Sequence, residues 1–288
     1  VQQGIERWSA RLMPMLLVTL LLLVVYVLTL DGAIEGLKVY LLPDFERAMS
    51  PALIINALGS AFFSLSLGVG TMLVYGSYIN DSENLPVVGG LVTLVDISIA
   101  VMAGFLVLPA MYVALHNGVE IFTATGELIS EDTLIFTVLP ELFNTMGIAG
   151  TVVSFTFFFL MSIAALTSSI SMLEVPVAYT IEEHGVSRKR SVIVIGVAIA
   201  VVSTIILINF EQLFGFVVAL TTRYSQPLLG FMFCIYAGWI WQRDKVLQEV
   251  RKGCPDVENY LFWKIWPSYV RYVCPVIILA IFAQTAFG

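Results

Sequence analysis

The sequence predicts an all-α, polytopic membrane protein, and three observations support this fold class. Of the 288 residues, 59% are hydrophobic and only 12% are charged, which is too little charge to cover a soluble domain of this length. The mean hydropathy is +0.93. Apolar runs recur along the whole chain, and several reach the roughly 20 residues that a helix needs to cross a bilayer.

Seven such runs are expected to form a single transmembrane domain over residues 1–288. The runs cover approximately residues 12–30, 52–79, 88–115, 147–181, 191–209, 214–242 and 267–286. Several are longer than a straight crossing requires, so tilted, broken or extended helices are expected. The start at Val1 has neither an initiator methionine nor a signal peptide, and it looks cut from a longer chain.

The charge distribution predicts the orientation of these spans. Eleven of the fourteen lysine and arginine residues precede the first span, follow the fourth, or lie between the sixth span and the first residues of the seventh. By the positive-inside rule this side faces the cytoplasm. The opposite loops, 31–50 and 116–146, are acidic and too long to be simple turns. The pI near 4.8 therefore reflects these loops, and no nucleic-acid partner is expected.

No catalytic or cofactor motif occurs in the sequence. The three cysteines, Cys234, Cys254 and Cys274, form no CxxC pair or cysteine–histidine cluster, and His116 and His184 lie next to span ends. Glycine pairs such as GVG lie inside spans and lack the strand that a nucleotide-binding fold requires. We therefore expect neither an enzyme nor an organic cofactor.

The stretch FFSLSLGVG, residues 62–70, interrupts the second run. Gly68 and Gly70 each weaken a helix by about 1 kcal/mol relative to alanine, and the hydroxyls of Ser64 and Ser66 compete for backbone partners. These residues predict two half-helices joined by an extended stretch near 64–68, which a membrane tolerates only where it lines a cavity. Half-helix ends would offer carbonyls to cations and N–H groups to a carboxylate. Close helix packing by small residues is the alternative.

Two further polar groups lie inside predicted spans. Asp96 indicates a functional site, because an acid inside a membrane is costly; a structural hydrogen bond is the alternative. In the fourth span Ala164, Thr167, Ser168 and Met172 share one helical face, where hydroxyls and carbonyls could coordinate a cation. Ordinary interhelical hydrogen bonding is the alternative for these hydroxyls.

Three other charged residues keep open roles. Glu174 lies deeper than a loop residue. Glu182 is at the cytoplasmic end of the fourth span, where a solvated face is the alternative to a functional role. Arg223 falls in the polar sequence TTRYSQP, either near an outer vestibule or reaching to the membrane surface.

The chain resembles the neurotransmitter:sodium symporter family, specifically its bacterial amino-acid transporters. The strongest matches are ALGSAFFSLSLGVGTMLVYGSYI (57–79), similar to the family's broken sixth helix, and AALTSSISMLEVPVA (164–178), similar to its eighth. The segments GIERWSARLMP (4–14), LTLDGAIEGLKVYLLPDF (28–45), DISIAVMAGFLVLPA (96–110) and WQRDKVLQEVRKG (241–253) also fit. The resemblance implies an inverted-repeat, leucine-transporter-like fold in the inner (cytoplasmic) membrane of a bacterium.

The resemblance also implies site residues. The seven runs would be the family's helices five to eleven, with the first four helices absent and required for a complete site. The residues that would border the substrate are Phe63, Ser64, Ser66, Val69, Ser168 and Met172. The residues that would hold sodium are Ser64 and Asp96 at one site, and Ala164, Thr167 and Ser168 at the other. Phe63 would close the outer gate, and Tyr78 and Glu182 would belong to the inner gate.

The function implied by the resemblance is sodium-coupled symport of an apolar amino acid across the bilayer by alternating access. Asp96 stands where many members have asparagine, so its carboxylate would replace the negative charge of chloride and make transport chloride-independent. Val69 replaces a bulkier aromatic residue of some relatives, which leaves room for a medium or large substrate. The alternatives are a truncated or split, non-transporting membrane component and a proton-coupled transporter of the same fold.

Overall fold

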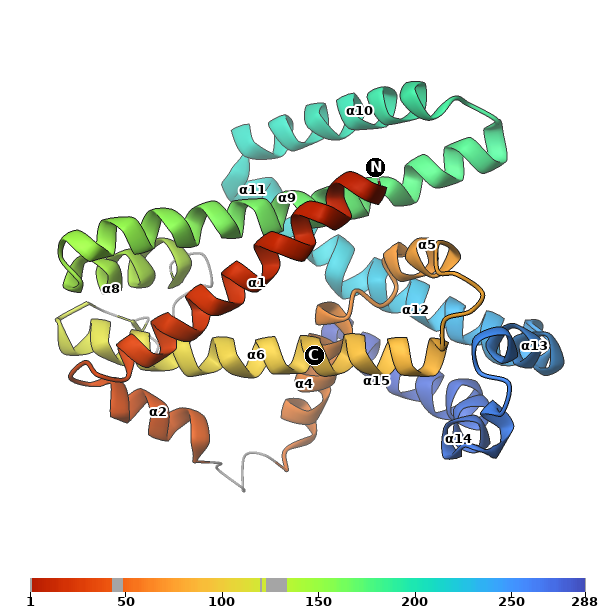
Figure 1. The fold of residues 1–288 in the computed structure, drawn as a ribbon, viewed down its shortest axis with the longest axis horizontal. Helices are drawn as coiled ribbons and strands as arrows, with labels where there is room; N and C mark the ends of the chain where they lie inside the picture. The colour runs from red at the N-terminus through yellow and green to blue at the C-terminus, as the bar shows by residue number, and fades with distance from the viewer. Residues whose placement is uncertain (1, 43–48, 120, 123–133, 288) are drawn as a thin grey trace. The chain divides into compact units, whose positions relative to one another are not determined.

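The computed structural model describes residues 2–42, 49–119, 121–122 and 134–287, and these residues form helices and no strand. The all-α prediction is therefore confirmed for this part of the chain (Figure 1). The chain divides into two compact units. The first comprises Val1–Phe45 and Val95–Ser169, and the second comprises Glu46–Leu94 and Ile170–Gly288. Two long helices, α6 and α9, contribute residues to both units.

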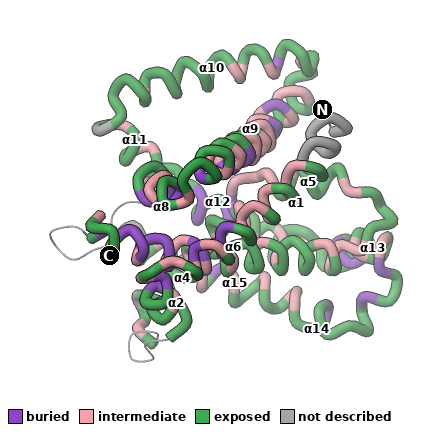
Figure 2. The backbone as a smooth tube through the Cα atoms, turned by 60° about the vertical axis from the view of Figure 1, so that its left-hand side comes forward, coloured by how far each residue is buried: buried purple, intermediate pink, exposed green. Residues whose placement is uncertain are grey.

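The first unit is a helical cluster around one apolar core. Its helices are α1 (Gln2–Val27), α2 (Ala33–Leu41), α6 (Leu85–His116, from Val95), the π-helical turn η1 (Leu134–Val138), α8 (Leu139–Thr145) and α9 (Ile148–His184, to Ser169). Leu23, Leu106, Met111 and Phe143 are nearly inaccessible to solvent and anchor this core. The buried stretches of α1, α6 and α8 are coloured purple in Figure 2.

Glycines let α2 approach α6 closely within this unit. A Cβ added to Gly36 of α2 would lie 2.6 Å from the carbonyl oxygen of Leu108, and one added to Gly104 of α6 would lie 2.4 Å from the ring of Tyr40. The Tyr40 hydroxyl donates a hydrogen bond to the carbonyl of Val101 at 3.1 Å. The loop expected over 31–50 therefore contains a short helix that small residues hold against α6.

The second unit contains the remaining helices. They are α4 (Pro51–Ser64), α5 (Thr71–Ser77), α10 (Arg188–Ile208), α11 (Phe210–Val218), η2 (Ala219–Ser225), α12 (Gln226–Ile235), η3 (Tyr236–Ile240), α13 (Arg243–Gly253), η4 (Val257–Asn259), α14 (Leu261–Ser268), η5 (Tyr269–Val273) and α15 (Cys274–Phe287). The helix α12 packs along α15, and α15 also contacts α4.

The sixth predicted span, 214–242, is not one regular helix. Two wide π-helical turns, η2 and η3, flank α12. Pro227 has no N–H to donate and its ring crowds the preceding turn, so the helix before it widens. Hydroxyl groups accompany the widening, since Thr222 Oγ1 donates to the Val218 carbonyl at 2.7 Å and Ser225 Oγ to the Leu220 carbonyl at 2.9 Å.

Five helices among the described residues are long and apolar enough to cross a membrane, by length and composition. They are Ala10–Val27, Leu85–His116, Ile148–His184, Arg188–Ile208 and Leu261–Gln284. At 1.5 Å per residue α9 is about 55 Å long, well beyond the roughly 30 Å of a hydrocarbon core, so it must tilt or extend into water. Most of α10 is exposed (Figure 2), as expected of a helix that contacts lipid or another part of a longer chain.

Candidate functional site

The predicted break in the second span is present. The helix α4 ends at Ser64, and α5 begins at Thr71 (Figure 1). The linking residues form turns, so the prediction of an extended stretch near 64–68 was wrong in its geometry. Three residues of the link have positive φ angles: Ser66 at 52°, Gly68 at 79° and Gly70 at 88°. Glycine adopts this conformation freely, and the structure therefore explains why the two glycines occur here.

Ser66 adopts the same left-handed conformation despite its Cβ. Such a conformation costs about 1–2 kcal/mol and is found where the surroundings enforce it, often at binding sites. Ser66 N–H bonds to the Phe63 carbonyl at 2.9 Å, and Leu67 N–H reaches back to the Phe62 carbonyl at 3.1 Å. The regular helical ladder stops at these bonds, and the next one, from Val69 N–H to the Ser66 carbonyl at 3.4 Å, belongs to the turns of the link.

The break is held against α12 within the second unit. Gly68 is buried, and a Cβ there would lie 2.1 Å from the carbonyl oxygen of Gln226 and 3.0 Å from the amide nitrogen of Gly230. Gly230 in turn faces the ring of Phe62, which a Cβ would approach to 2.3 Å. Backbone therefore meets backbone where the helix is interrupted, and only glycine fits at position 68.

Gln226 is a site residue that sequence reasoning missed. Its side chain is 5% exposed, and among the described residues its Nε2 has no hydrogen-bond partner. Thr71 Oγ1, in the first turn of α5, is likewise buried without a described partner. Burying a polar group unpaired costs about 1–3 kcal/mol, so two such groups beside the break indicate a place where polar partners are expected. The glutamine inside an apolar span was the available signal.

On the hydroxyl-bearing face of α9, two predicted sodium ligands, Ala164 and Thr167, lie in contact. Thr167 Oγ1 donates to the Ala164 carbonyl oxygen at 2.8 Å, so these two predicted sodium ligands present adjacent oxygens on one turn. Ser168 is exposed on the next position, and Met172 is 54% exposed one turn further on. Oxygens placed this closely could contact one small cation together.

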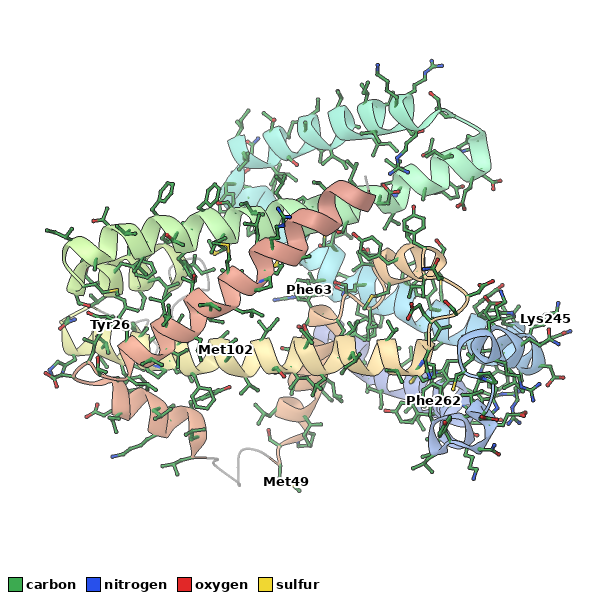
Figure 3. The ribbon with its side chains drawn as sticks, in the orientation of Figure 1. Tyr26, Met49, Phe63, Met102, Lys245 and Phe262 are labelled. Atoms are coloured by element: carbon green, nitrogen blue, oxygen red, sulfur yellow. The ribbon has the colours of Figure 1, made fainter. Side chains whose placement is uncertain are left out.

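The predicted residues fall in different units. Those in the first are Asp96, Ala164, Thr167 and Ser168, and those in the second are Phe63, Ser64, Ser66, Val69 and Met172. Phe63 is 59% exposed at the end of α4 (Figure 3), and Asp96 is partly buried on α6. That both groups form one site, with Ser64 and Asp96 sharing a sodium ion, stays a prediction.

A buried carboxylate links three helices of the second unit. Glu174 of α9 is 8% exposed, and Arg188 of α10 donates from Nη2 to both carboxylate oxygens, at 2.7 and 2.6 Å. The Tyr78 hydroxyl, just after α5, donates to Glu174 Oε1 at 2.8 Å. A second bond, from the Tyr75 hydroxyl to Ser171 Oγ, also joins α5 to α9. We call Tyr78, Glu174 and Arg188 the α5–α9–α10 cluster.

This cluster gives Glu174 the partner that the sequence left open. A carboxylate that accepts three hydrogen bonds, two from a cation, is well satisfied despite its burial. Removing one partner of such a pair is costly because it leaves an uncompensated charge. Glu182, the acid predicted for the inner gate, is exposed and forms no ion pair with any described residue, and its role in the gate stays a prediction. Tyr78 is the predicted gating residue that has a charged partner here.

The described part of the chain contains no group of three histidine, cysteine or acidic side chains that could hold a transition metal.

Five helices of membrane length among the described residues, together with a shorter apolar helix, Leu53–Ser64, that ends at residues with positive φ, are the architecture of a polytopic membrane protein with a discontinuous helix. The chain belongs to the Sodium:neurotransmitter symporter family, whose profile it matches over residues 1–287.

Two curated relatives are similar over nearly the whole chain. An uncharacterised sodium-dependent transporter of Haemophilus influenzae is 33% identical over 290 residues, which are 99% of this chain and 61% of the relative. The uncharacterised sodium-dependent transporter YhdH of Bacillus subtilis is 32% identical over 297 residues, which are 98% of this chain and 62% of the relative. The chain thus spans about three fifths of the length of these relatives.

A solved structure supports the fold. The crystal structure of MhsT in complex with L-phenylalanine superposes with a TM-score of 0.80 at 32% sequence identity, covering 95% of this chain and 61% of that one. The predicted leucine-transporter-like fold is therefore confirmed.

Proposed function

We propose that the protein containing this chain is a sodium-coupled symporter of an apolar amino acid in the inner (cytoplasmic) membrane. The observation that carries the proposal is the break between α4 and α5, with its three positive φ angles and its glycine contact with α12. Family membership supports sodium as the coupling ion. The L-phenylalanine in the MhsT complex supports a large apolar substrate, since 95% of the present chain matches that structure.

In this proposal Ser64, Ser66 and Val69 border the substrate together with Ser168 and Met172, and Phe63 closes the outer side. The oxygens of Ala164, Thr167 and Ser168 contribute to one sodium site, and Ser64 and Asp96 to the other. The adjacent oxygens of Ala164 and Thr167 support the first assignment.

The α5–α9–α10 cluster suits an inner gate. Tyr78 and Tyr75 each bond across from the α5 segment to α9, so both bonds must break if α5 moves away from α9 during alternating access. Because Glu174 keeps Arg188 when Tyr78 leaves, the carboxylate stays paired in the open state. The gate can therefore open without exposing an unpaired buried charge.

The test is uptake of labelled L-phenylalanine by the full-length protein in proteoliposomes, with sodium outside and choline as the replacement. We expect uptake that depends on sodium and continues when a protonophore collapses the proton gradient. Uptake that ignores sodium but stops with the protonophore would refute sodium coupling and favour proton coupling. Absence of uptake for a panel of apolar amino acids would refute the substrate class.

Chloride independence is tested through Asp96. We expect wild-type uptake to be unchanged when gluconate replaces chloride, because the carboxylate supplies the negative charge beside sodium. In Asp96→Asn that charge is lost, so uptake should come to depend on chloride. Equal uptake by this variant with and without chloride would contradict the role given to Asp96.

A further inference from the structure

A pocket separate from the proposed transport site lies in the second unit, between the end of α12–η3 and the segments α13, α14 and η5. Its volume is about 310 Å³, at the lower end of the range of roughly 300–1,000 Å³ typical of ligand pockets. Its wall includes four of the five tryptophans of the chain and two arginines. These residues are Trp239, Trp241, Arg243, Trp263, Trp266 and Arg271. Figure 3 shows Lys245 and Phe262 in this α13–α14 region.

Both arginines are held by aromatic rings. The Arg271 guanidinium lies 4.2 Å from the ring centre of Trp239 and 5.5 Å from that of Tyr272, and Arg243 lies 6.0 Å from that of Trp263. The Trp239 indole N–H also donates to the Arg271 carbonyl at 3.2 Å. A planar guanidinium stacked on a ring keeps its N–H edge free for a bidentate acceptor.

Glycine makes this arrangement possible. A Cβ added to Gly238 would lie 2.9 Å from the Cα of Arg271, so η3 and η5 approach each other backbone to backbone. The close approach sets Trp239 directly beside Arg271. The tertiary packing of these two π-helical turns therefore builds this part of the site.

The charge in the pocket is uncompensated within the described residues. None of the residues that line it is acidic, and neither arginine forms an ion pair with a described carboxylate. Other cations of the same region are paired: Arg251 with Glu258, and Lys252 with Asp81 and Glu249. The pocket thus selects an anion, and the two arginines exclude the quaternary ammonium groups that a cage of tryptophans alone would attract.

The position of the pocket relates it to the membrane. The span Leu261–Gln284 starts in its wall, and tryptophan and tyrosine concentrate at membrane–water interfaces. The basic residues around it place this interface on the cytoplasmic side by the positive-inside rule. The apolar side chain of Ile240, which lines the pocket, is 65% exposed and offers a surface for acyl chains.

We propose that this pocket binds the phosphate of an anionic glycerophospholipid from the cytoplasmic leaflet. The guanidinium groups of Arg243 and Arg271 hold the phosphodiester oxygens, and the tryptophan rings line the glycerol region. Basic pockets between helices on this side of a membrane are suited to anionic headgroups. The lipid then ties α12–η3 to the start of α15.

The test is native mass spectrometry of the full-length protein, delipidated and titrated with palmitoyl-oleoyl phosphatidylglycerol or with the matching phosphatidylcholine. We expect preferential retention of phosphatidylglycerol, and an affinity at least tenfold lower in Arg271→Gln and in Arg243→Gln. The matched controls are Lys264→Gln and Lys245→Gln, which remove the same charge from the same region outside the pocket wall. In these two control variants the affinity for phosphatidylglycerol should fall by less than about fivefold, which is the effect of one cation near an anionic surface.

Equal losses in all four variants would overturn the pocket in favour of diffuse surface charge. Equal retention of phosphatidylcholine would overturn the choice of an anionic headgroup. A third arm adds soluble glycerol phosphate at the lipid concentration, and displacement of the lipid by it would overturn the membrane source. Thermal unfolding of each variant identifies misfolding. Because the one ring contact of Arg243 among the described residues is with Trp263, at 6.0 Å, Arg243→Gln keeps the test decisive if Arg271→Gln fails to fold.

Discussion

Replacing Gly68 by alanine tests whether the helix break is held by its contact with α12. The new Cβ would lie 2.1 Å from the Gln226 carbonyl oxygen, and this oxygen is backbone that no side-chain rotation can move. The φ angle of 79° adds about 1–2 kcal/mol for a residue with a Cβ. Overpacking adds about 1–3 kcal/mol, so we expect Gly68→Ala to lower the free energy of unfolding by about 2–5 kcal/mol.

Two other glycines of the same region are matched controls. Gly76 lies inside α5, and a Cβ added there would have no atom within 4 Å, so alanine at this position should be neutral or stabilising by up to about 1 kcal/mol. Gly70 has a φ of 88°, but the nearest neighbour of an added Cβ is the Val175 side chain at 3.1 Å. Gly70→Ala should therefore cost mainly the backbone strain of about 1–2 kcal/mol.

The assay is thermal unfolding of the purified full-length protein in detergent. After heating, size-exclusion chromatography measures the fraction of the protein that remains monodisperse. We expect the melting temperature of Gly76→Ala to match or exceed wild type, followed by Gly70→Ala and then Gly68→Ala. Sodium-dependent substrate binding should fall in the same order. A Gly68→Ala protein as stable as Gly76→Ala would refute the inferred contact between the break and α12.

Two further substitutions probe polar groups of the second unit by the same unfolding assay. Glu174→Gln leaves Arg188 without its carboxylate, so we expect the free energy of unfolding to fall by about 1–3 kcal/mol. The control Glu183→Gln changes an exposed residue and should alter the free energy of unfolding by less than about 0.5 kcal/mol. Equal melting temperatures of the two variants would contradict the importance of the ion pair between Glu174 and Arg188. Polar partners are expected at the break, so Gln226→Leu should lower the stability of the full-length protein by about 1–3 kcal/mol. A gain of stability in Gln226→Leu would contradict this expectation.

The parts of the site that follow from local sequence were predictable. Helical spacing placed Ala164 and Thr167 on one turn, and the structure shows their oxygens 2.8 Å apart. Serines and glycines at close spacing predicted the interruption near residue 66, because each weakens a helix on its own. The turn geometry of the link was not predictable, since a positive φ at Ser66 depends on surroundings that lie elsewhere in the chain.

The parts that depend on distant residues were missed. Glu174 lies 96 residues from Tyr78 and meets Arg188 from the next helix, so no local pattern identifies the trio. Gln226 is one polar residue in an apolar run, and only the approach of Gly68 to its carbonyl places it at the break. The tryptophan–arginine pocket likewise joins residues of η3 and η5, which are separated by further helices along the chain.

Composition and short-range spacing were sufficient to establish an all-α membrane protein with one interrupted helix, because they control hydropathy and helix propensity. The tertiary structure decides which groups contact one another. Arg188 and Tyr78 form hydrogen bonds with Glu174, and α12 packs against the break. An aromatic ring lies beside each of two arginines, Arg243 and Arg271, that form no ion pair with a described residue. This division arises because hydrogen bonds, ion pairs and close packing act over a few ångströms in space, whatever the separation along the chain.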